Sequence, residues 1–470
     1  MERVIMTSFL SSPVSRRSVL IGGAALLGTA GLSACSPSGA SSSGSKTLNV
    51  AYFGTQQAAD ATAKVAQPFI KANPGVTVKF NGINGTDWND FFTKVLTQIA
   101  AGNPPDIVSV ATEGVQLFAQ KKLAHPLDDY VKRDKDQLAP YFKDVHPSLV
   151  EAMMYQGNLY ELPTDFNAGN MYFNTNLLQK SGLQLPSPSW TMDDFHSVAT
   201  SLKSNSGAVP FDWVVRLWGS WTSFMYANGG NLVTEGKYTG GDWLWSQFYA
   251  NDPAAAGRGG GWKWGAPTAN SDAVVESLDY MVELANSGLS AKPDVGGGST
   301  LQGLFASNKI GMSIGGGFWA GGLHNAGMQN GSFDVQFFPK WKVQRHLFGT
   351  GGYGIFESSK NKDLAWEFLK SLVEPAAIDV LTSGNSTTPA RRSMMTADRY
   401  STTGPKNWQV FYDTLDKLPN TAPIPAPPYY NAMANALNQR TTQAMSSGNA
   451  KSALDGLQQD LETAAASVGS

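Results

Sequence analysis

Residues 311–315, Gly-Met-Ser-Ile-Gly, fit the G-x-S-x-G pattern that holds the nucleophile of many hydrolases. That chemistry needs a tight turn at Ser313 with a helix after it, and an acid and a histidine downstream. Asp334 and His346 follow in the right order. However, apolar neighbours flank Ser313 as in a continuing strand, and a glycine run replaces the helix start. Short glycine motifs arise by chance, so we predict no catalytic serine here.

Metal and phosphate chemistry lack the necessary residue spacing. No metal-ligand spacing connects the five histidines, which are His125, His146, His196, His324 and His346. Cys35 is the only cysteine, and no Lys-Ser/Thr follows Gly315–Gly317 as a phosphate loop requires. We therefore predict no metal ion and no cofactor. Paired carboxylates for glycoside hydrolysis meet in space and not in sequence, so an exported glycoside hydrolase stays an alternative.

The remaining chemical signal is aromatic. Of the residues, 11% are aromatic and only 15% are charged. Several rings lie beside glycine, proline or polar residues and not within amphipathic helices: Trp218, Trp221, Phe318, Trp319, Tyr353, Tyr429 and Tyr430. A flat ring can stack on the C–H face of a pyranose while neighbouring polar groups bond its hydroxyls. Taken singly, each ring is better explained as core packing; taken together, they favour a carbohydrate site.

Strands and helices that alternate along the first part of the chain must position these groups. Apolar alternation predicts strands at 48–52 and 76–80 and a buried strand at 106–110, with helices at 61–69 and 88–99 between them. Such alternation indicates parallel pairing with helices on both faces of a sheet. Ligands of open sheets bind beyond the carboxyl ends of the strands, which are here residues 55–57, 82–88 and 111–113.

Two later segments read as crossings between globular units. The chain alternates up to Pro163, crosses residues 164–167, and alternates again through Phe173. We expect a turn at Asp165, whose carboxylate then faces the space between the units or simply caps the turn. Residues 349–355, Gly-Thr-Gly-Gly-Tyr-Gly-Ile, predict a second crossing. The length of the chain also favours two lobes over a single core.

The N-terminus has the features of an export signal. Arg16 and Arg17 precede a short apolar run that ends in Leu-Ser-Ala-Cys35, so residues 1–34 resemble a twin-arginine signal with a lipobox. Residues 35–45 then form a Ser/Gly-rich tether. We expect the protein to be exported and lipid-anchored through Cys35 on the outer face of the cytoplasmic membrane. The formal net charge of −2 gives no reason to expect a nucleic-acid partner.

The mature chain resembles bacterial extracellular solute-binding proteins of family 1, the maltose-binding-like class of ABC sugar importers. The resemblance rests on PFIKANPGVTVKF, WNDFFTKVLTQIAAGNPPDIVSV, GNLYELPTDFNAGNMYFNTNLLQKSGL, SNKIGMSIGGGFWAGGL and GGYGIFESSKNKDLAWEFLKSLV. It implies an α/β, two-lobe, periplasmic-binding-protein-like fold of the type II, Venus-flytrap kind with hinge crossings. One lobe would hold residues 46–163 and about 355–398, and the other 164–354 and about 399–470.

The resemblance also implies a role and a set of contacts. The protein would close on a mono- or oligosaccharide and deliver it to ABC permease subunits as a monomer, without catalysis. By position, the polar contacts would be Gln56, Gln57, Glu113 and Asp165, beside the seven aromatic residues named above. The alternatives are the hydrolase and a binding protein for a polyamine, an anion or a ferric ion. The aromatic residues of segment 237–265 would either roof the cleft or pack on it.

Overall fold

A seven-stranded mixed sheet organises the first part of the chain. The computed structural model describes residues 46–295 and 298–468, so the predicted signal, the tether and Cys35 lie outside it. The strand order is β16-β6-β15-β3-β1-β2, with β17 beside β15. The strands are β1 (Lys46–Phe53), β2 (Val76–Ile83), β3 (Ile107–Ala111), β6 (Glu161–Ala168), β15 (Leu347–Ile355), β16 (Thr388–Pro389) and β17 (Ala422–Pro423).

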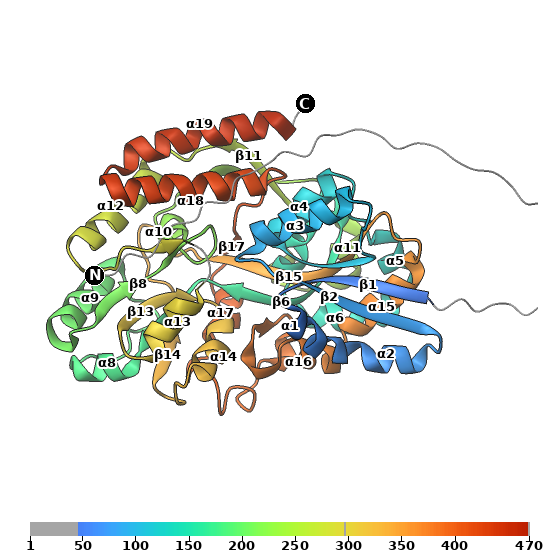
Figure 1. The fold of residues 1–470 in the computed structure, drawn as a ribbon, viewed down its shortest axis with the longest axis horizontal. Helices are drawn as coiled ribbons and strands as arrows, with labels where there is room; N and C mark the ends of the chain where they lie inside the picture. The colour runs from blue at the N-terminus through green and yellow to red at the C-terminus, as the bar shows by residue number, and fades with distance from the viewer. Residues whose placement is uncertain (1–45, 296–297, 469–470) are drawn as a thin grey trace, which may run out of the picture. The chain divides into compact units, whose positions relative to one another are not determined.

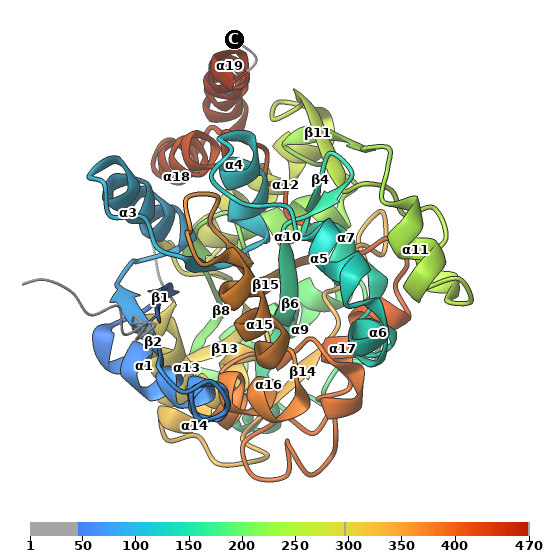
Figure 2. The same ribbon diagram turned by 90° about the vertical axis from the view of Figure 1, so that its right-hand side faces the viewer.

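The parallel core of this sheet confirms the predicted alternation. β1 pairs in parallel with both β2 and β3, while β15 runs antiparallel to β3 and β6. Helices α3 (Trp88–Ala100) and α4 (Thr112–Gln120) lie on one side of these strands, and α1 (Gln56–Thr62) and α2 (Gln67–Ala72) on the other (Figures 1 and 2). Pro68 interrupts the expected helix 61–69, because Pro lacks an N–H; a 3₁₀ turn, Ala63–Ala66, separates α1 from α2.

The expected turn at Asp165 is wrong. Strand β6 continues through Asp165 to Ala168, and pairs on one side with β15 and on the other with β16. The register shifts by one residue at Thr164, because Gly351 faces Asp165 while Gly352 faces Pro163. A bulge beside Pro163 accommodates a residue that cannot donate to the ladder. The strand therefore crosses this region extended and turns the Asp165 carboxylate out of the sheet.

A second, four-stranded sheet has the order β14-β7-β13-β8. Its strands are β7 (Asn170–Asn174), β8 (Val209–Asp212), β13 (Ile310–Gly315) and β14 (Phe333–Gln336). Ser313 lies within β13, is fully buried, and donates from Oγ to the carbonyl of Asp212 at 2.7 Å. This position confirms that residues 311–315 continue a strand and form no nucleophile turn. Two-stranded pairs are β4 (Met154–Tyr155) with β5 (Asn158–Leu159), β9 (Val214–Val215) with β12 (Asp294–Val295), and β10 (Val233–Lys237) with β11 (Trp262–Pro267).

The other helices cover these sheets, and the last two of them form a pair at the C-terminus. They are α5 (Asp128–Arg133), α6 (Lys135–Asp144), α7 (Pro147–Ala152), α8 (Thr175–Lys180), α9 (Met192–Ser206), α10 (Trp221–Ala227), α11 (Asp242–Phe248), α12 (Asp272–Asn286), α13 (Ser299–Ala306), α14 (Phe318–Asn325), α15 (Lys362–Leu372), α16 (Pro375–Leu381), α17 (Val410–Asp416), α18 (Tyr430–Ser447) and α19 (Ala450–Val468), with 3₁₀ turns at Pro253–Ala255, Ser383–Asn385 and Arg392–Met394. Helices α18 and α19 lie side by side (Figures 1 and 2). Within the described residues, no helix combines the length and apolar character that crossing a membrane requires.

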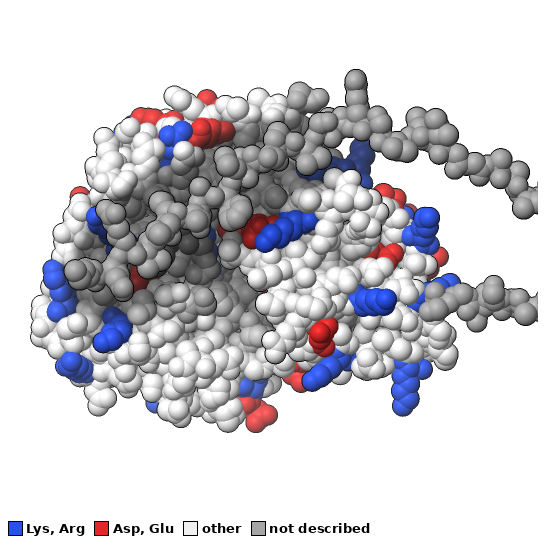
Figure 3. Space-filling model, in the orientation of Figure 1, with Lys and Arg blue, Asp and Glu red and all other residues white. Residues whose placement is uncertain are grey.

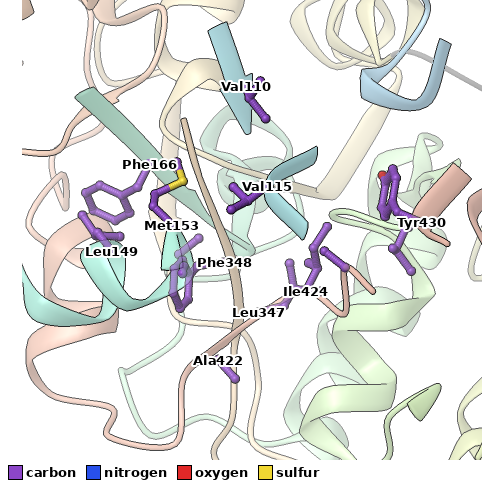
Figure 4. Packing of buried hydrophobic residues seen from close by; sticks show 14 of the residues in the cluster. Val110, Val115, Leu149, Met153, Phe166, Leu347, Phe348, Ala422, Ile424 and Tyr430 are labelled. Carbon is purple, nitrogen blue, oxygen red and sulfur yellow. The ribbon is translucent and has the colours of Figure 1, made fainter. Parts of the chain in front are cut away.

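The hydrophobic core joins strands that are distant in sequence. Val110 of β3, Phe166 of β6 and Phe348 of β15 belong to one cluster of buried side chains, with Val115 of α4 and Leu149 of α7 among its members (Figure 4). Each of these five side chains is at most 1% exposed. This packing fixes the edge of the sheet from which the candidate site is built. On the face shown in Figure 3, acidic and basic side chains of the described chain are scattered among neutral residues.

The aromatic segment 237–265 packs on other elements and lies outside the cleft described below. Phe248 of α11 stacks on Phe142 of α6 with ring centroids 4.2 Å apart. Glu151 of α7, which is fully buried, accepts from Lys237 Nζ at 2.6 Å and from Arg258 Nη1 at 2.7 Å. Lys237 and Arg258, from two parts of the segment, thus both bind the Glu151 carboxylate.

Candidate functional site

A cavity of about 420 Å³ lies where the carboxyl ends of β1 and β3 face β6, β15 and the start of α18. Segments from most of the chain contribute to it, including Phe53 at the end of β1, Trp88 at the start of α3, and Asn438 in α18. Its volume is within the range of small-molecule sites, and its walls combine aromatic rings with a few polar groups. This position agrees with the general rule for ligands of open α/β sheets.

Six of the eleven residues predicted as ligand contacts line this cavity. They are Glu113, Asp165, Trp218, Phe318, Tyr353 and Tyr430. They come from α4, β6, the loop before α10, α14, β15 and α18, so the structure brings together residues up to about three hundred positions apart. Their contact with a ligand stays a prediction.

The other five residues lie outside the cavity lining. Trp221 is fully buried in α10, and its Nε1 donates to Thr441 Oγ1 at 3.0 Å. Trp319 is fully buried against Phe305, because it follows Phe318 on a helix and points about 100° away from it. Gln56 bonds the backbone at Phe80 and Gly82. Gln57 is exposed on α1, and Tyr429 is buried before α18.

An aromatic wall is formed by Trp218 and Phe318, whose ring centroids are 5.6 Å apart. Both rings are partly exposed, as a ligand-facing surface requires. Arg216 donates from Nε to the Trp218 carbonyl at 2.7 Å, and its guanidinium lies 5.5 Å from the Trp218 ring centroid. Burial lowers the pKa of Arg216 to about 10, and nearby Asp87 and Glu113 act in the opposite direction. Arg216 therefore supports one end of the wall.

Glu113 is the most unusual acid of the cavity. It is 3% exposed, and its Oε2 has no hydrogen-bond partner. Burial raises the pKa of Glu113 to about 7, and the negative charge of Asp87 adds to this more than Arg216 subtracts. A side chain at Gly349 would bring its Cβ within 3.8 Å of Oε2 and 3.4 Å of the Trp218 ring. The Glu113 carboxyl group and the Trp218 indole therefore both lie near Gly349.

Asp165 belongs to a hydrogen-bond network that reaches α14. Thr387 Oγ1 donates to Asp165 Oδ1 at 3.0 Å, and Asn167 Nδ2 donates to Thr387 Oγ1 at 2.9 Å. The Phe318 N–H donates to Asn167 Oδ1 at 3.3 Å. Burial raises the pKa of Asp165 to about 6, against the lowering effect of the Thr387 and Thr164 hydroxyl groups. A Cβ on Gly351 would lie 2.8 Å from Asp165 Oδ2, so only glycine lets β15 approach the carboxylate.

Several further residues line the cavity but are not among the eleven predicted contacts. Asp87 caps α3 by accepting from the Asp90 N–H at 2.9 Å, and Trp88 follows it with its ring 4.5 Å from that of Phe53. The strand-end rule had marked residues 82–88, so position gave a signal for these two. Asn167 and Thr387 are ordinary polar residues in sequence. Only their hydrogen bonds in the folded chain distinguish them.

Other hollows in the described part of the chain offer less. One of about 440 Å³ is an open groove along α12, and one of about 510 Å³ lies at Lys237, Arg258 and Arg345, whose charges are already paired with Glu151 and Glu235. No group of three or more potential metal ligands occurs among residues 46–295 and 298–468. The cavity at Glu113 and Trp218 is therefore the candidate site.

Comparisons with known proteins agree with this architecture. The family described as bacterial extracellular solute-binding protein matches residues 54–379. A putative binding protein of Brucella abortus is 25% identical over 321 residues, which cover 66% of this chain and 68% of that protein.

Solved structures share the fold. An ABC substrate-binding protein from Listeria monocytogenes, in complex with cycloalternan, superposes with a TM-score of 0.70 at 20% identity, over 89% of this chain and 98% of that one. The GacH receptor of Streptomyces glaucescens, solved unliganded and with acarbose, gives 0.67 at 19% identity, over 89% and 98%. The fold is therefore the mixed α/β, two-lobe periplasmic-binding-protein fold. With more than half of its length matched, the chain belongs to the bacterial extracellular solute-binding protein family.

Proposed function

We propose that this protein binds a mono- or oligosaccharide outside the cytoplasm, closes its two lobes on it, and delivers it to the permease of an ABC importer. One observation supports this most directly. Aromatic rings from separate parts of the chain, Trp88, Trp218 and Phe318 among them, line one cavity together with carboxylates and amides. Rings supply the apolar face that a pyranose stacks on, and Asp165 and Asn167 supply acceptors for its hydroxyls.

Relatives with the same fold support the ligand class. The Listeria protein was solved with cycloalternan and the Streptomyces receptor with acarbose, both of which are carbohydrates or carbohydrate analogues. The lobe boundaries remain part of the proposal, with residues 46–163 and about 355–398 in one lobe and 164–354 and about 399–470 in the other. Lobe closure would couple ligand binding to permease docking, since only the closed state contacts the sugar from both sides.

The anchor and the oligomeric state belong to the proposal as well. Residues 1–34 would direct export, and lipidation of Cys35 would hold a monomer on the outer face of the cytoplasmic membrane. Such an anchor would keep the binding site near the permease.

A titration with a panel of mono- and oligosaccharides tests the proposal. Binding should quench or shift tryptophan fluorescence, because Trp88 and Trp218 line the cavity, and should raise the melting temperature by mass action. As a matched control, Asp129→Asn changes a fully exposed carboxylate on α5 that does not line the cavity. Absence of any response across the panel refutes the sugar proposal.

A glycoside hydrolase is the second candidate, and one observation favours it. Two carboxyl groups with raised pKa values, Glu113 and Asp165, line the same cavity, as acid–base pairs do in hydrolases. Incubation with a labelled oligosaccharide separates the candidates, because a binding protein returns its ligand intact. Release of shorter products that Glu113→Gln abolishes establishes the hydrolase.

A further inference from the structure

The charges that line the cavity are unequal. The acidic and basic lining residues are three carboxyl groups, Asp87, Glu113 and Asp165, and one guanidinium, Arg216. A neutral sugar needs hydroxyl-directed acceptors but no excess of negative charge. A buried carboxyl group is costly to ionise without a cationic partner, and a cation bound in the cavity would remove that cost.

No cation of the described chain makes an ion pair with these three carboxylates. The ion pairs among residues 46–295 and 298–468 all join other acids to their partners. Arg216 Nε instead donates a hydrogen bond to the Trp218 carbonyl. Asp165 is satisfied only by neutral hydroxyls, from Thr387 and Thr164.

Of the three carboxyl groups, Glu113 shows the lack of a cationic partner most clearly. Its Oε2 is buried without a hydrogen-bond partner, and both this atom and the Trp218 ring lie near Gly349. Burial disfavours the ionised form of Glu113 and so does the nearby Asp87, while a backbone hydrogen bond and Arg216 act in the opposite direction. An ammonium group here would donate a charge-assisted hydrogen bond to the Glu113 carboxylate, and the faces of nearby aromatic rings also attract cations.

Resting on the proposed function, we infer that the preferred ligand is a sugar with a basic nitrogen, an amino sugar or an oligosaccharide that contains one, whose ammonium group pairs with Glu113. The rings hold the pyranose, the acceptors of Asp165 and Asn167 take its hydroxyls, and the cation neutralises the excess acid. The inference concerns this cavity alone.

Isosteric pairs of sugars provide the test. Glucose and glucosamine, galactose and galactosamine, and cellobiose and the glucosamine β-1,4 dimer differ by a hydroxyl or an amine at C2, and N-acetylated forms keep the nitrogen without the charge. Calorimetric titration of the purified protein should give, for at least one pair, roughly ten-fold tighter binding of the amino form, because hydrogen bonds to charged groups are stronger by about 1–1.5 kcal/mol. Acetylation should remove this gain.

Substitutions show whether Glu113 is responsible. Glu113→Gln keeps the shape and should reduce the preference for the amino form to near unity. Asp87→Asn serves as a second variant, because Asn also caps helices well, and should lower the preference without loss of the fold. Asp129→Asn, on the exposed side of α5, should leave it unchanged.

The outcomes separate the two proposals. If neutral sugars bind as tightly as their amino counterparts, the inference is overturned and the proposed function stands. If no sugar of either kind binds, both are overturned. Binding of spermidine without any sugar also overturns both, and indicates a polyamine-binding protein.

Discussion

Replacement of Glu113 by glutamine should stabilise the ligand-free protein at alkaline pH while it weakens ligand binding. Glu113 has a pKa of about 7 in the folded protein against 4.5 for an ordinary glutamate, because burial disfavours its charge. Below pH 4.5 both states carry the proton. Between pH 4.5 and pH 7 the unfolded chain loses it while the folded chain retains it, so the free energy of unfolding falls as pH rises.

The size of the effect follows from these two pKa values. Between pH 5 and pH 8, linkage gives a loss of about 2.5 kcal/mol in the free energy of unfolding of the wild-type protein through this one group. Glutamine does not titrate, so the variant should escape that loss. For a chain of this length the difference corresponds to roughly 3 °C in melting temperature.

Thermal melts of both proteins without ligand, at pH 5 and pH 8, provide the measurement. The quantity of interest is the change in the variant-minus-wild-type difference between the two pH values, which cancels the pH dependence of every other group. Asp129→Asn should show no such change, since its carboxylate is fully exposed. A Glu113→Gln protein that gains nothing at pH 8 relative to pH 5 would refute the argument that Glu113 is buried without compensation.

Three further predictions concern the cavity wall, the aromatic segment and the anchor. Trp218→Ala should weaken sugar binding at least ten-fold in calorimetry with little change in melting temperature. Trp221→Ala should instead destabilise the fold by about 3–5 kcal/mol, because its ring is fully buried. Equal effects of the two changes on stability would contradict this assignment. Glu151→Ala should lower the free energy of unfolding by about 3–5 kcal/mol in chemical denaturation, since Lys237 and Arg258 would lose their partner. If Glu151→Gln is as stable as the wild type, the charge of Glu151 is unimportant there. Cys35→Ala should move the protein from the membrane fraction to the medium in cell fractionation, and retention in the membrane fraction would rule out the lipid anchor.

Local patterns in the sequence determined much of the fold. The strands around Val50, Val78 and Val110 and the helix that Asp87 caps were predictable, because side-chain periodicity and capping are properties of neighbouring residues. The same reasoning rejected Ser313 as a nucleophile, since its apolar neighbours required a strand. The predicted turn at Asp165 failed because sheet pairing on both sides of β6 outweighed a local preference.

The site depended on contacts that no local pattern contains. Residue type and glycine neighbours selected Trp218 and Trp221 equally, yet one lines the cavity and the other bonds Thr441 in the core. Likewise, the sequence shows Glu113 as a helix residue and Arg216 as a lone cation. Their shared electrostatics arises only when α4, β15 and the loop before α10 pack together, because burial and charge balance are properties of the assembled chain.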